Sequence, residues 1–479
     1  RRHPERQALN MRTVLMTVAA ILALTVGAKG DCYRPREWNG RCSRDPYRLP
    51  STLFGTKTTY PHATGLDSKR ARRVYVRGCT PLLLMLVMRH TTRYPGKKDI
   101  IKFSTRLTEL RSEILNASRP TSAHLCKDHI KLLKKWKYTW NVSDEYQVTK
   151  SGIKDTARIA ARLQQMFPSL LRDRFEEDWY TVTATTKVRT QDTANAFLKE
   201  VLKKKEFRKF ENPKYLQLND SLLGFDSICE ERLKKQGVNK TESKQEKAFL
   251  SGVQVSKMVE AFSRRIGVNV SAGDVKLMAK ICSFEVAHYG WSLFCYLFDR
   301  EDLDLFEYAD DLDDYEKDVY GNERSVAMGC VLVDELLDKI REKVQERVTG
   351  GHHAKRRLRS ALYFTHAPVI KSLIGKLGLG RTEPPLRADN YCDYKYYRPW
   401  RSSHMVPFTA NIAMALFECG HQGFYVLPLL NEKAIRLPGC RNEFCPLSDF
   451  LRTRAVLSSR SCDLAKICSK DWNPNAGPE

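Results

Sequence analysis

The sequence lacks the motifs of several large enzyme classes. It contains no GxSxG elbow, no GxxxxGK[ST] phosphate loop and no GxGxxG turn after a strand, which disfavours serine hydrolases, phosphate-loop nucleotide enzymes and dinucleotide oxidoreductases. It also lacks paired CxxC and HExxH motifs, so we expect no metal and no other cofactor. No RNA-binding aromatic motif, zinc finger or basic zipper is present either, which argues against a nucleic-acid partner.

Long apolar runs are scarce as well. The chain of 479 residues has 20 prolines and 42% hydrophobic residues, a composition typical of a folded globular protein. One apolar run, 14–26, follows Met11 and a single arginine and precedes small residues, and it is too short to span a bilayer. We therefore predict upstream residues plus a secretory signal peptide over 1–30, with a buried N-terminal helix as the alternative. We expect no transmembrane segment and no C-terminal retention signal.

Two further features agree with export. The chain has 14 cysteines, which in an oxidising compartment are expected to pair, and local bridges Cys32–Cys42 and Cys440–Cys445 are plausible from their spacing. Five Asn-x-Ser/Thr sites are present, at Asn116, Asn141, Asn219, Asn239 and Asn269. The prediction is an extracellular or lumenal glycoprotein with disulfide bonds.

The chain has fewer acidic than basic side chains. The formal net charge is +25, which attracts polyanions by long-range steering. Because export makes intracellular nucleic acid an unsuitable partner, phosphorylated small molecules and the sulfated glycans of cell surfaces are the classes that remain.

Three segments share one pattern, in which an apolar or β-branched strand runs into a polar turn and then into a helical pattern. Such alternation predicts a parallel sheet in an α/β fold, where ligands bind beyond the carboxyl ends of the strands. The residues expected there are Arg89, His90 and Arg93 after strand 82–88, Arg189 after strand 180–183, and His366 after strand 361–364.

Arginine forks and histidines at strand ends make a positively charged cup that suits a phosphoryl group. Phosphate-ester hydrolysis without a metal needs a nucleophile, positive groups on the equatorial oxygens, and an acid for the leaving alkoxide. His90 can supply the first by forming a phosphohistidine. Arg89, Arg93, Arg189 and His366 can supply the second, although any one of these residues taken alone also suits a purely structural role.

The region between the second and third strands has helical character. Its acidic stretch, 300–318, is interpreted as a solvated amphipathic helix because it lacks the glycine and the ligand spacing of a calcium loop. The predicted organisation is a first part of the α/β core over 31–204, a helical cap insertion over 205–354, and a second part of the core over 355–479.

The motif RHTTRYP at 89–95 closely resembles the RHGxRxP signature of the histidine acid phosphatases. The wider chain is similar to the multiple inositol polyphosphate phosphatase branch, through FGTKTTY, KVRTQDTANAFL, FEYADDLDDYEKDVYG, VPFTANIAMALFEC and LLNEKAIRLPGCRNEFCPLSDFL. The resemblance implies a phosphoglycerate-mutase-like α/β core with a helical cap, and inositol polyphosphates as substrates.

The resemblance also implies roles for individual residues. His90 would be the nucleophile, and His366 would be a second phosphate-binding histidine. The implied phosphate or substrate ligands are Arg89, Arg93, Arg189, Thr92 and Lys57. The implied disulfides are Cys79–Cys419, Cys282–Cys295 and Cys440–Cys445.

Two positions depart from the family pattern. Thr91 stands where the family has glycine, which adds a side chain where backbone approaches phosphate. Pro368 stands where the family's His-Ala-Glu has its glutamate, so the group that would protonate the leaving oxygen is missing. General acid catalysis contributes about 10²–10⁴-fold in rate.

Three hypotheses follow. The favoured one is a slow, metal-independent phosphatase of inositol polyphosphates that uses water or another carboxylate as its acid. The second is a catalytically silent binder of polyphosphorylated or sulfated anions. The third is a basic extracellular protein held on cell-surface glycans by its general charge.

Overall fold

The computed structural model describes residues 32–34, 52–117, 125–239, 242–349, 357–458 and 462–474. The predicted signal peptide over 1–30 lies outside these residues. Among the described residues, no helix combines the length and the apolar character that crossing a membrane requires.

A sheet of eight strands forms the centre of the described chain, in the order β3-β2-β4-β1-β5-β6-β7, with β8 paired to β6. Strands β1, β2, β3 and β4 run parallel to one another, whereas β5 runs antiparallel to β1 and β6 runs antiparallel to β5. The bounds are β1 Thr80–Arg89, β2 Tyr180–Ala184, β3 Leu216–Leu218, β4 Ser360–Thr365, β5 Asn411–Glu418, β6 Phe424–Leu430, β7 Lys433–Ala434 and β8 Cys445–Pro446. The predicted α/β core is confirmed, and the antiparallel half is an addition that the three strand–helix patterns do not predict.

Helices cover both faces of the sheet. Alternate residues of a strand point to opposite faces, so β1 contributes side chains to both hydrophobic clusters. In β1, Leu84, Leu86 and Met88 pack in one hydrophobic cluster with helices α6 (Lys150–Met166) and α7 (Val188–Val201). Leu83, Met85 and Val87 pack in the other cluster, with α16 (Cys330–Val348) and α17 (Ala367–Lys376). This double burial explains why 82–88 is a continuous apolar run.

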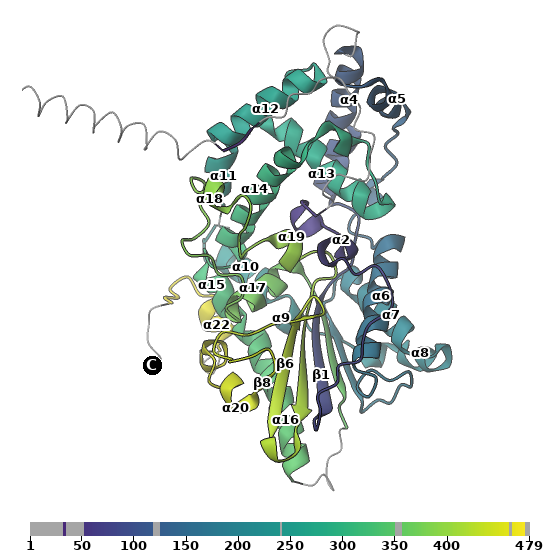
Figure 1. Ribbon diagram of the computed structural model, residues 1–479, viewed down its shortest axis with the longest axis vertical. Helices are drawn as coiled ribbons and strands as arrows, with labels where there is room; N and C mark the ends of the chain where they lie inside the picture. The colour runs from purple at the N-terminus through teal and green to yellow at the C-terminus, as the bar shows by residue number, and fades with distance from the viewer. Residues whose placement is uncertain are drawn as a thin grey trace, which may run out of the picture.

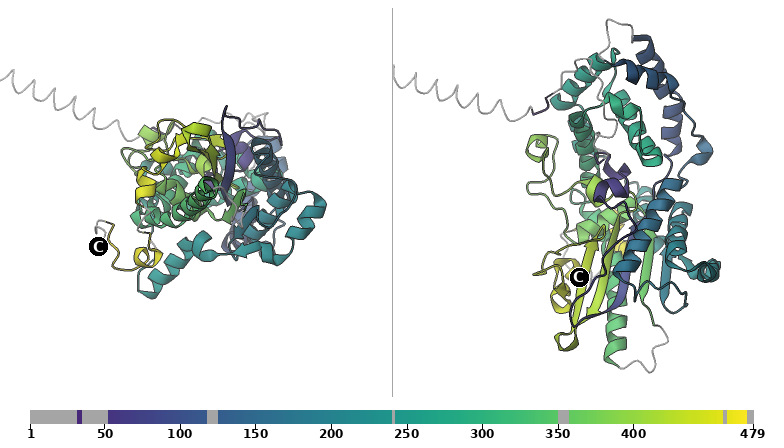
Figure 2. Two further views of the ribbon diagram at one scale, coloured as in Figure 1. Left: turned by 90° about the horizontal axis from the view of Figure 1, so that it is seen from below. Right: turned by 45° about the vertical axis from the view of Figure 1, so that its right-hand side comes forward.

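A mainly helical region links β3 to β4. Helices α12 (Val253–Ile266) and α13 (Ala272–Tyr289) lie at the end of the molecule away from the sheet, whereas α16 packs against the sheet (Figures 1 and 2). The other longer helices of this region are α10 Phe225–Lys235 and α14 Arg300–Asp318. Helices α3 (Lys97–Ser104) and α4 (Arg106–Ala117) come earlier in the chain but also pack against α13. The predicted division into core and cap stays a prediction.

The interpretation of 300–318 as a solvated helix was wrong. Helix α14 is largely buried, and its carboxylates meet arginines from the segment 398–401. The Arg398 guanidinium lies 2.6 Å from Asp311 Oδ2 and 2.9 Å from Glu307 Oε2, and all three side chains are fully buried. Carboxylates can be buried when they are paired and hydrogen-bonded, which a single helix sequence does not reveal.

The described cysteines form disulfides, and none of them is free. Cys79–Cys419, Cys282–Cys295 and Cys440–Cys445 are present as expected. The expected Cys32–Cys42 bridge was wrong, because Cys32 pairs with Cys392 across 360 residues of sequence. Spacing along the chain favours short loops, whereas the fold brings Cys32 and Cys392 together from distant parts of the chain.

Candidate functional site

The segment that follows β1 carries the proposed nucleophile. Arg89 is the last residue of β1, and the backbone N–H of His90 donates to the carbonyl of Thr365, the last residue of β4, at 2.8 Å. This bond ties the ends of two parallel strands together. It places His90 and His366 side by side, with ring centroids 5.6 Å apart. The predicted meeting of these residues at the carboxyl ends of the strands is therefore present in the fold.

His90 is arranged to use one ring nitrogen. Its Nδ1 lies 2.9 Å from the carbonyl oxygen of Thr91, which accepts a hydrogen bond, so Nδ1 carries the proton and Nε2 keeps a lone pair. Burial lowers the pKa of His90 well below its usual value, and the positive charges of Arg89, Arg93 and Arg189 lower it further. A neutral imidazole with a free Nε2 is the form that can attack phosphorus.

Three arginines surround the two histidines. Arg89 donates to the carbonyls of Thr56 and Val406 at 2.6 and 2.8 Å and lies over the ring of Phe408. Arg93 and Arg189 both lie against the ring of Tyr146, with the guanidinium carbons 4.7 and 5.2 Å from its centroid. Sequence reasoning missed Tyr146, because an aromatic platform 50 residues from the signature has no motif of its own.

The cationic groups are costly to hold in this position. Burial lowers the pKa of Arg89 to about 9 and of Arg93 to about 10, and in each case a neighbouring arginine lowers it further. The Nε atoms of Arg89, Arg93 and Arg189 are buried and have no hydrogen-bond partner among the described residues. Buried donors without partners are rare in folded proteins, and a bound anion would give such donors an acceptor.

The second histidine is oriented by a threonine that the sequence patterns did not single out. His366 Nε2 lies 3.0 Å from Oγ1 of Thr185, which follows β2 and is buried. His366 Nδ1 is buried without a partner among the described residues. Burial lowers the pKa of His366 to about 3, with the arginines as the second cause. His366 is therefore a neutral hydrogen-bonding group. Like His90, it is buried and lies near the arginines.

Thr91 does not carry the steric penalty that its sequence position suggests. Its hydroxyl donates to the carbonyl of Gly152 in α6 at 2.7 Å, and the whole residue is buried. A Cβ on Gly152 would lie 2.7 Å from this hydroxyl and 2.6 Å from the carbonyl oxygen of Thr92. The larger residue in the loop is thus matched by glycine in the helix beneath it. Thr92 keeps a buried hydroxyl oxygen without a partner among the described residues.

Pro368 lies at the start of α17, which begins directly after His366. Proline is tolerated in the first turn of a helix because the N–H there has no partner within the helix. The strand–turn–helix shape therefore accommodates a proline at this position.

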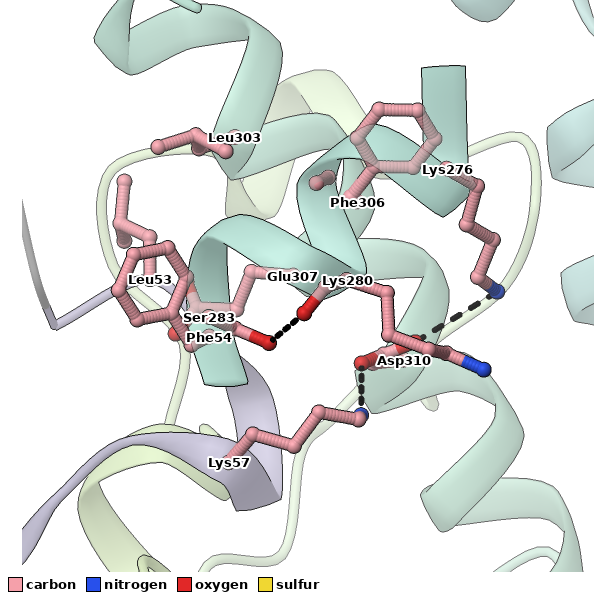
Figure 3. Close-up of a pocket in the computed structure, with 11 residues that line it drawn as sticks. Leu53, Phe54, Lys57, Lys276, Lys280, Ser283, Leu303, Phe306, Glu307 and Asp310 are labelled. Atoms are coloured by element: carbon pink, nitrogen blue, oxygen red, sulfur yellow. Dashed lines mark hydrogen bonds and ion pairs between the residues drawn. The ribbon is translucent and has the colours of Figure 1, made fainter. Parts of the chain in front are cut away.

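Lys57 lies in a short 3-10 helix, η1 (Gly55–Lys57), beside a small cavity shown in Figure 3. Its Nζ is 3.2 Å from Oδ2 of Asp310 in α14, and Lys276 of α13 approaches the other oxygen at 3.5 Å. Although burial opposes ionisation, these lysines hold the pKa of Asp310 at about 2. Lys57 is thus engaged in an ion pair in this structure.

The site's donor set does not resemble a metal centre. Within the part of the chain that the structure describes, no three His, Cys, Asp or Glu side chains are grouped so as to hold a metal ion.

Known proteins that are similar to this chain also indicate a phosphate-binding site. A family model described as the histidine phosphatase superfamily (branch 2) matches residues 83–431. The chain belongs to this superfamily. The family expected from RHTTRYP is confirmed, and with it the predicted class of enzyme, a histidine-type phosphatase.

Several curated proteins are similar to the chain over most of its length. Multiple inositol polyphosphate phosphatase 1 of Drosophila melanogaster is 27% identical over 437 residues, which cover 88% of each chain. The Homo sapiens protein of the same name is 26% identical over 469 residues, covering 90% of this chain and 93% of its own.

Solved structures agree in fold. The phytase from D. castellii superposes with a TM-score of 0.63 at 17% identity, covering 88% of this chain and 87% of its own. The Bifidobacterium longum multiple inositol polyphosphate phosphatase, in complex with inositol hexasulfate, has a TM-score of 0.60 at 14% identity and covers 83% and 96% of the two chains. The predicted fold class is confirmed.

Proposed function

We propose that this protein hydrolyses phosphomonoesters of inositol polyphosphates through a phosphohistidine on His90. The observation that carries the proposal is the set of buried, unpaired donors around a neutral histidine: three arginine Nε atoms and His366 Nδ1. Their number and charge suit the oxygens of a phosphoryl group. The names of the similar proteins support inositol polyphosphates as the substrate class.

Each residue has a distinct role in this proposal. His90 Nε2 forms the bond to phosphorus, while Arg89, Arg93 and Arg189 hold the phosphoryl oxygens as negative charge shifts onto them. His366 and Thr92 donate further hydrogen bonds. Lys57 would meet a more distant phosphate of the substrate by exchanging its ion pair with Asp310 for one with the ligand.

We also propose that the protein acts in the secretory pathway or outside the cell. The described cysteines are all paired, which suits an oxidising compartment. The five asparagines of the glycosylation sites are exposed. Retention on sulfated glycans through the general charge of the chain stays a prediction.

The second candidate function is a silent binder of polyphosphorylated or sulfated anions, and Pro368 is the observation that favours it. Release of inorganic phosphate from inositol hexakisphosphate by the secreted protein separates the two candidates. We expect wild type to release phosphate and His90→Ala to release none. Saturable binding with no release by wild type, and release gained by Pro368→Glu, would instead establish a binder.

A further inference from the structure

The enzyme needs a proton donor that the turn after β4 does not supply. An inositol alkoxide is a poor leaving group, and a positioned acid contributes about 10²–10⁴-fold to such a step. Pro368 has no ionisable group. The inference that follows rests on the proposed function and names a residue that completes it.

A carboxylate approaches this end of the sheet from a different element. Asp226 lies in the first turn of α10, directly after α9 (Asp220–Leu223). The hydroxyl of Thr365, next to His366, donates to the carbonyl of Leu223 at 2.5 Å and so fixes this segment at the end of β4. Helix α10 also packs against α17, the helix that Pro368 begins, and Figure 1 shows α9, α10 and α17 at the same end of the sheet.

Among the described residues, Asp226 forms no ion pair with a lysine or an arginine, in contrast to Asp314, another buried acid near this end of the sheet. The Oδ1 of Asp226 is buried without a side-chain or backbone hydrogen-bond partner among the described residues, its Oδ2 has a long contact of 3.5 Å with the Ser227 hydroxyl, and backbone N–H groups at the start of α10 also face the carboxyl. Asp314 is also buried, with an Oδ2 that has no partner among the described residues, and burial raises its pKa to about 7, but its Oδ1 forms an ion pair with Lys371. We propose that Asp226 is the general acid of the reaction, in place of the glutamate that Pro368 replaces.

The charges that face Asp226 suit this role. Burial lowers the pKa of Arg189 in α7, and the charge of Asp226 is near enough to oppose part of that lowering, so the carboxyl lies on the side of the phosphate-binding arginines. Burial raises the pKa of Asp226 to about 6, and the negative charge of Asp318 in α14 adds to the effect. Asp226 is therefore protonated in mildly acidic solution, where His90 is still neutral.

The transfer then balances in two steps. His90 Nε2 forms a bond to phosphorus as the bond from phosphorus to the inositol oxygen breaks, and that oxygen takes the proton of Asp226. The Asp226 carboxylate next removes a proton from water as the water oxygen bonds to phosphorus and the phosphorus–nitrogen bond breaks. Inorganic phosphate leaves, and both residues return to their starting protonation states.

Two substrates with different leaving groups test the assignment. Nitrophenolate leaves without protonation, whereas an inositol alkoxide does not. We expect Asp226→Asn to lose about 10²–10⁴-fold in kcat on inositol hexakisphosphate and little on p-nitrophenyl phosphate. Glu231→Gln, an exposed carboxylate on the same helix, is the matched control and should behave as wild type. Adding Pro368→Glu to Asp226→Asn should restore turnover of the inositol substrate.

The pH profile gives a second readout. In wild type, kcat on inositol hexakisphosphate should fall above pH about 6, because the acid form of Asp226 is lost, and this fall should be absent in Asp226→Asn.

Three results would overturn the proposal. Full activity of Asp226→Asn on the inositol substrate would show that another group is the acid. An equal loss on both substrates, together with weaker binding of inorganic phosphate, would make Asp226 a positioning residue for Arg189. Absence of phosphate release by wild type from either substrate would remove the proposed function itself, and the general acid with it, which is a different outcome from the first two.

Discussion

Replacement of Arg93 by methionine tests the anion site in two independent ways. The guanidinium carries a buried Nε without a partner among the described residues, and this donor is free to bind a phosphate oxygen. A hydrogen bond to a charged group contributes about 1.5–3 kcal/mol. Its loss should weaken the affinity for inorganic phosphate roughly 10- to 150-fold, since every 1.4 kcal/mol is tenfold.

The same substitution should raise the pKa of His90, because Arg93 is one of the positive charges that lower it. Calorimetric titration with inorganic phosphate measures the first effect, and NMR titration of the imidazole measures the second. Lys98→Met, an exposed lysine on α3, is the control for a change in net charge. If phosphate affinity and the His90 pKa in Arg93→Met equalled those of the control, the assignment of the anion site would be refuted.

Three further predictions concern stability. Arg398→Met should lower the free energy of unfolding by about 3–5 kcal/mol, because it removes the cation between Glu307 and Asp311. Urea unfolding measures this loss, with Arg381→Met, which removes an exposed ion pair with Glu383, as the control. A loss no larger than that of the control would contradict the prediction. Gly152→Ala should cost about 1–3 kcal/mol by overpacking against the loop after β1, and a neutral effect in the same assay would show that this loop has room to move. Burial lowers the pKa of His288 to about 4, whereas the unfolded residue has a pKa of about 6.5. Between these two pH values the unfolded state binds more protons, so the free energy of unfolding falls by about 1.4 kcal/mol for each pH unit that the pH is lowered. His288→Phe should flatten this slope, and an unchanged slope would exclude His288 as its source.

The sequence predicts the strand ends correctly because each of the three buried strands is a short apolar or β-branched run that is followed by a polar turn. Arg89, His90 and His366 lie there as expected. Arg189 was expected in the turn but lies in the first turn of α7, since that helix already begins at Val188.

Other features could not be predicted because their partners are far away in the chain. The burial of Asp311 depends on Arg398, and the buried Thr91 packs against Gly152 of α6. Thr185 and Asp226 belong to no motif, and the contact of Thr185 with His366 joins residues that are 181 positions apart in the chain.

Trapping of the covalent intermediate tests the central claim most directly. Wild type mixed with inositol hexakisphosphate and quenched in alkali should carry a phosphoryl group on the peptide that contains His90, since phosphohistidine survives base. His90→Ala should carry none and release no phosphate. Continued phosphate release by His90→Ala, or a phosphoryl group on another residue of wild type, would contradict the account.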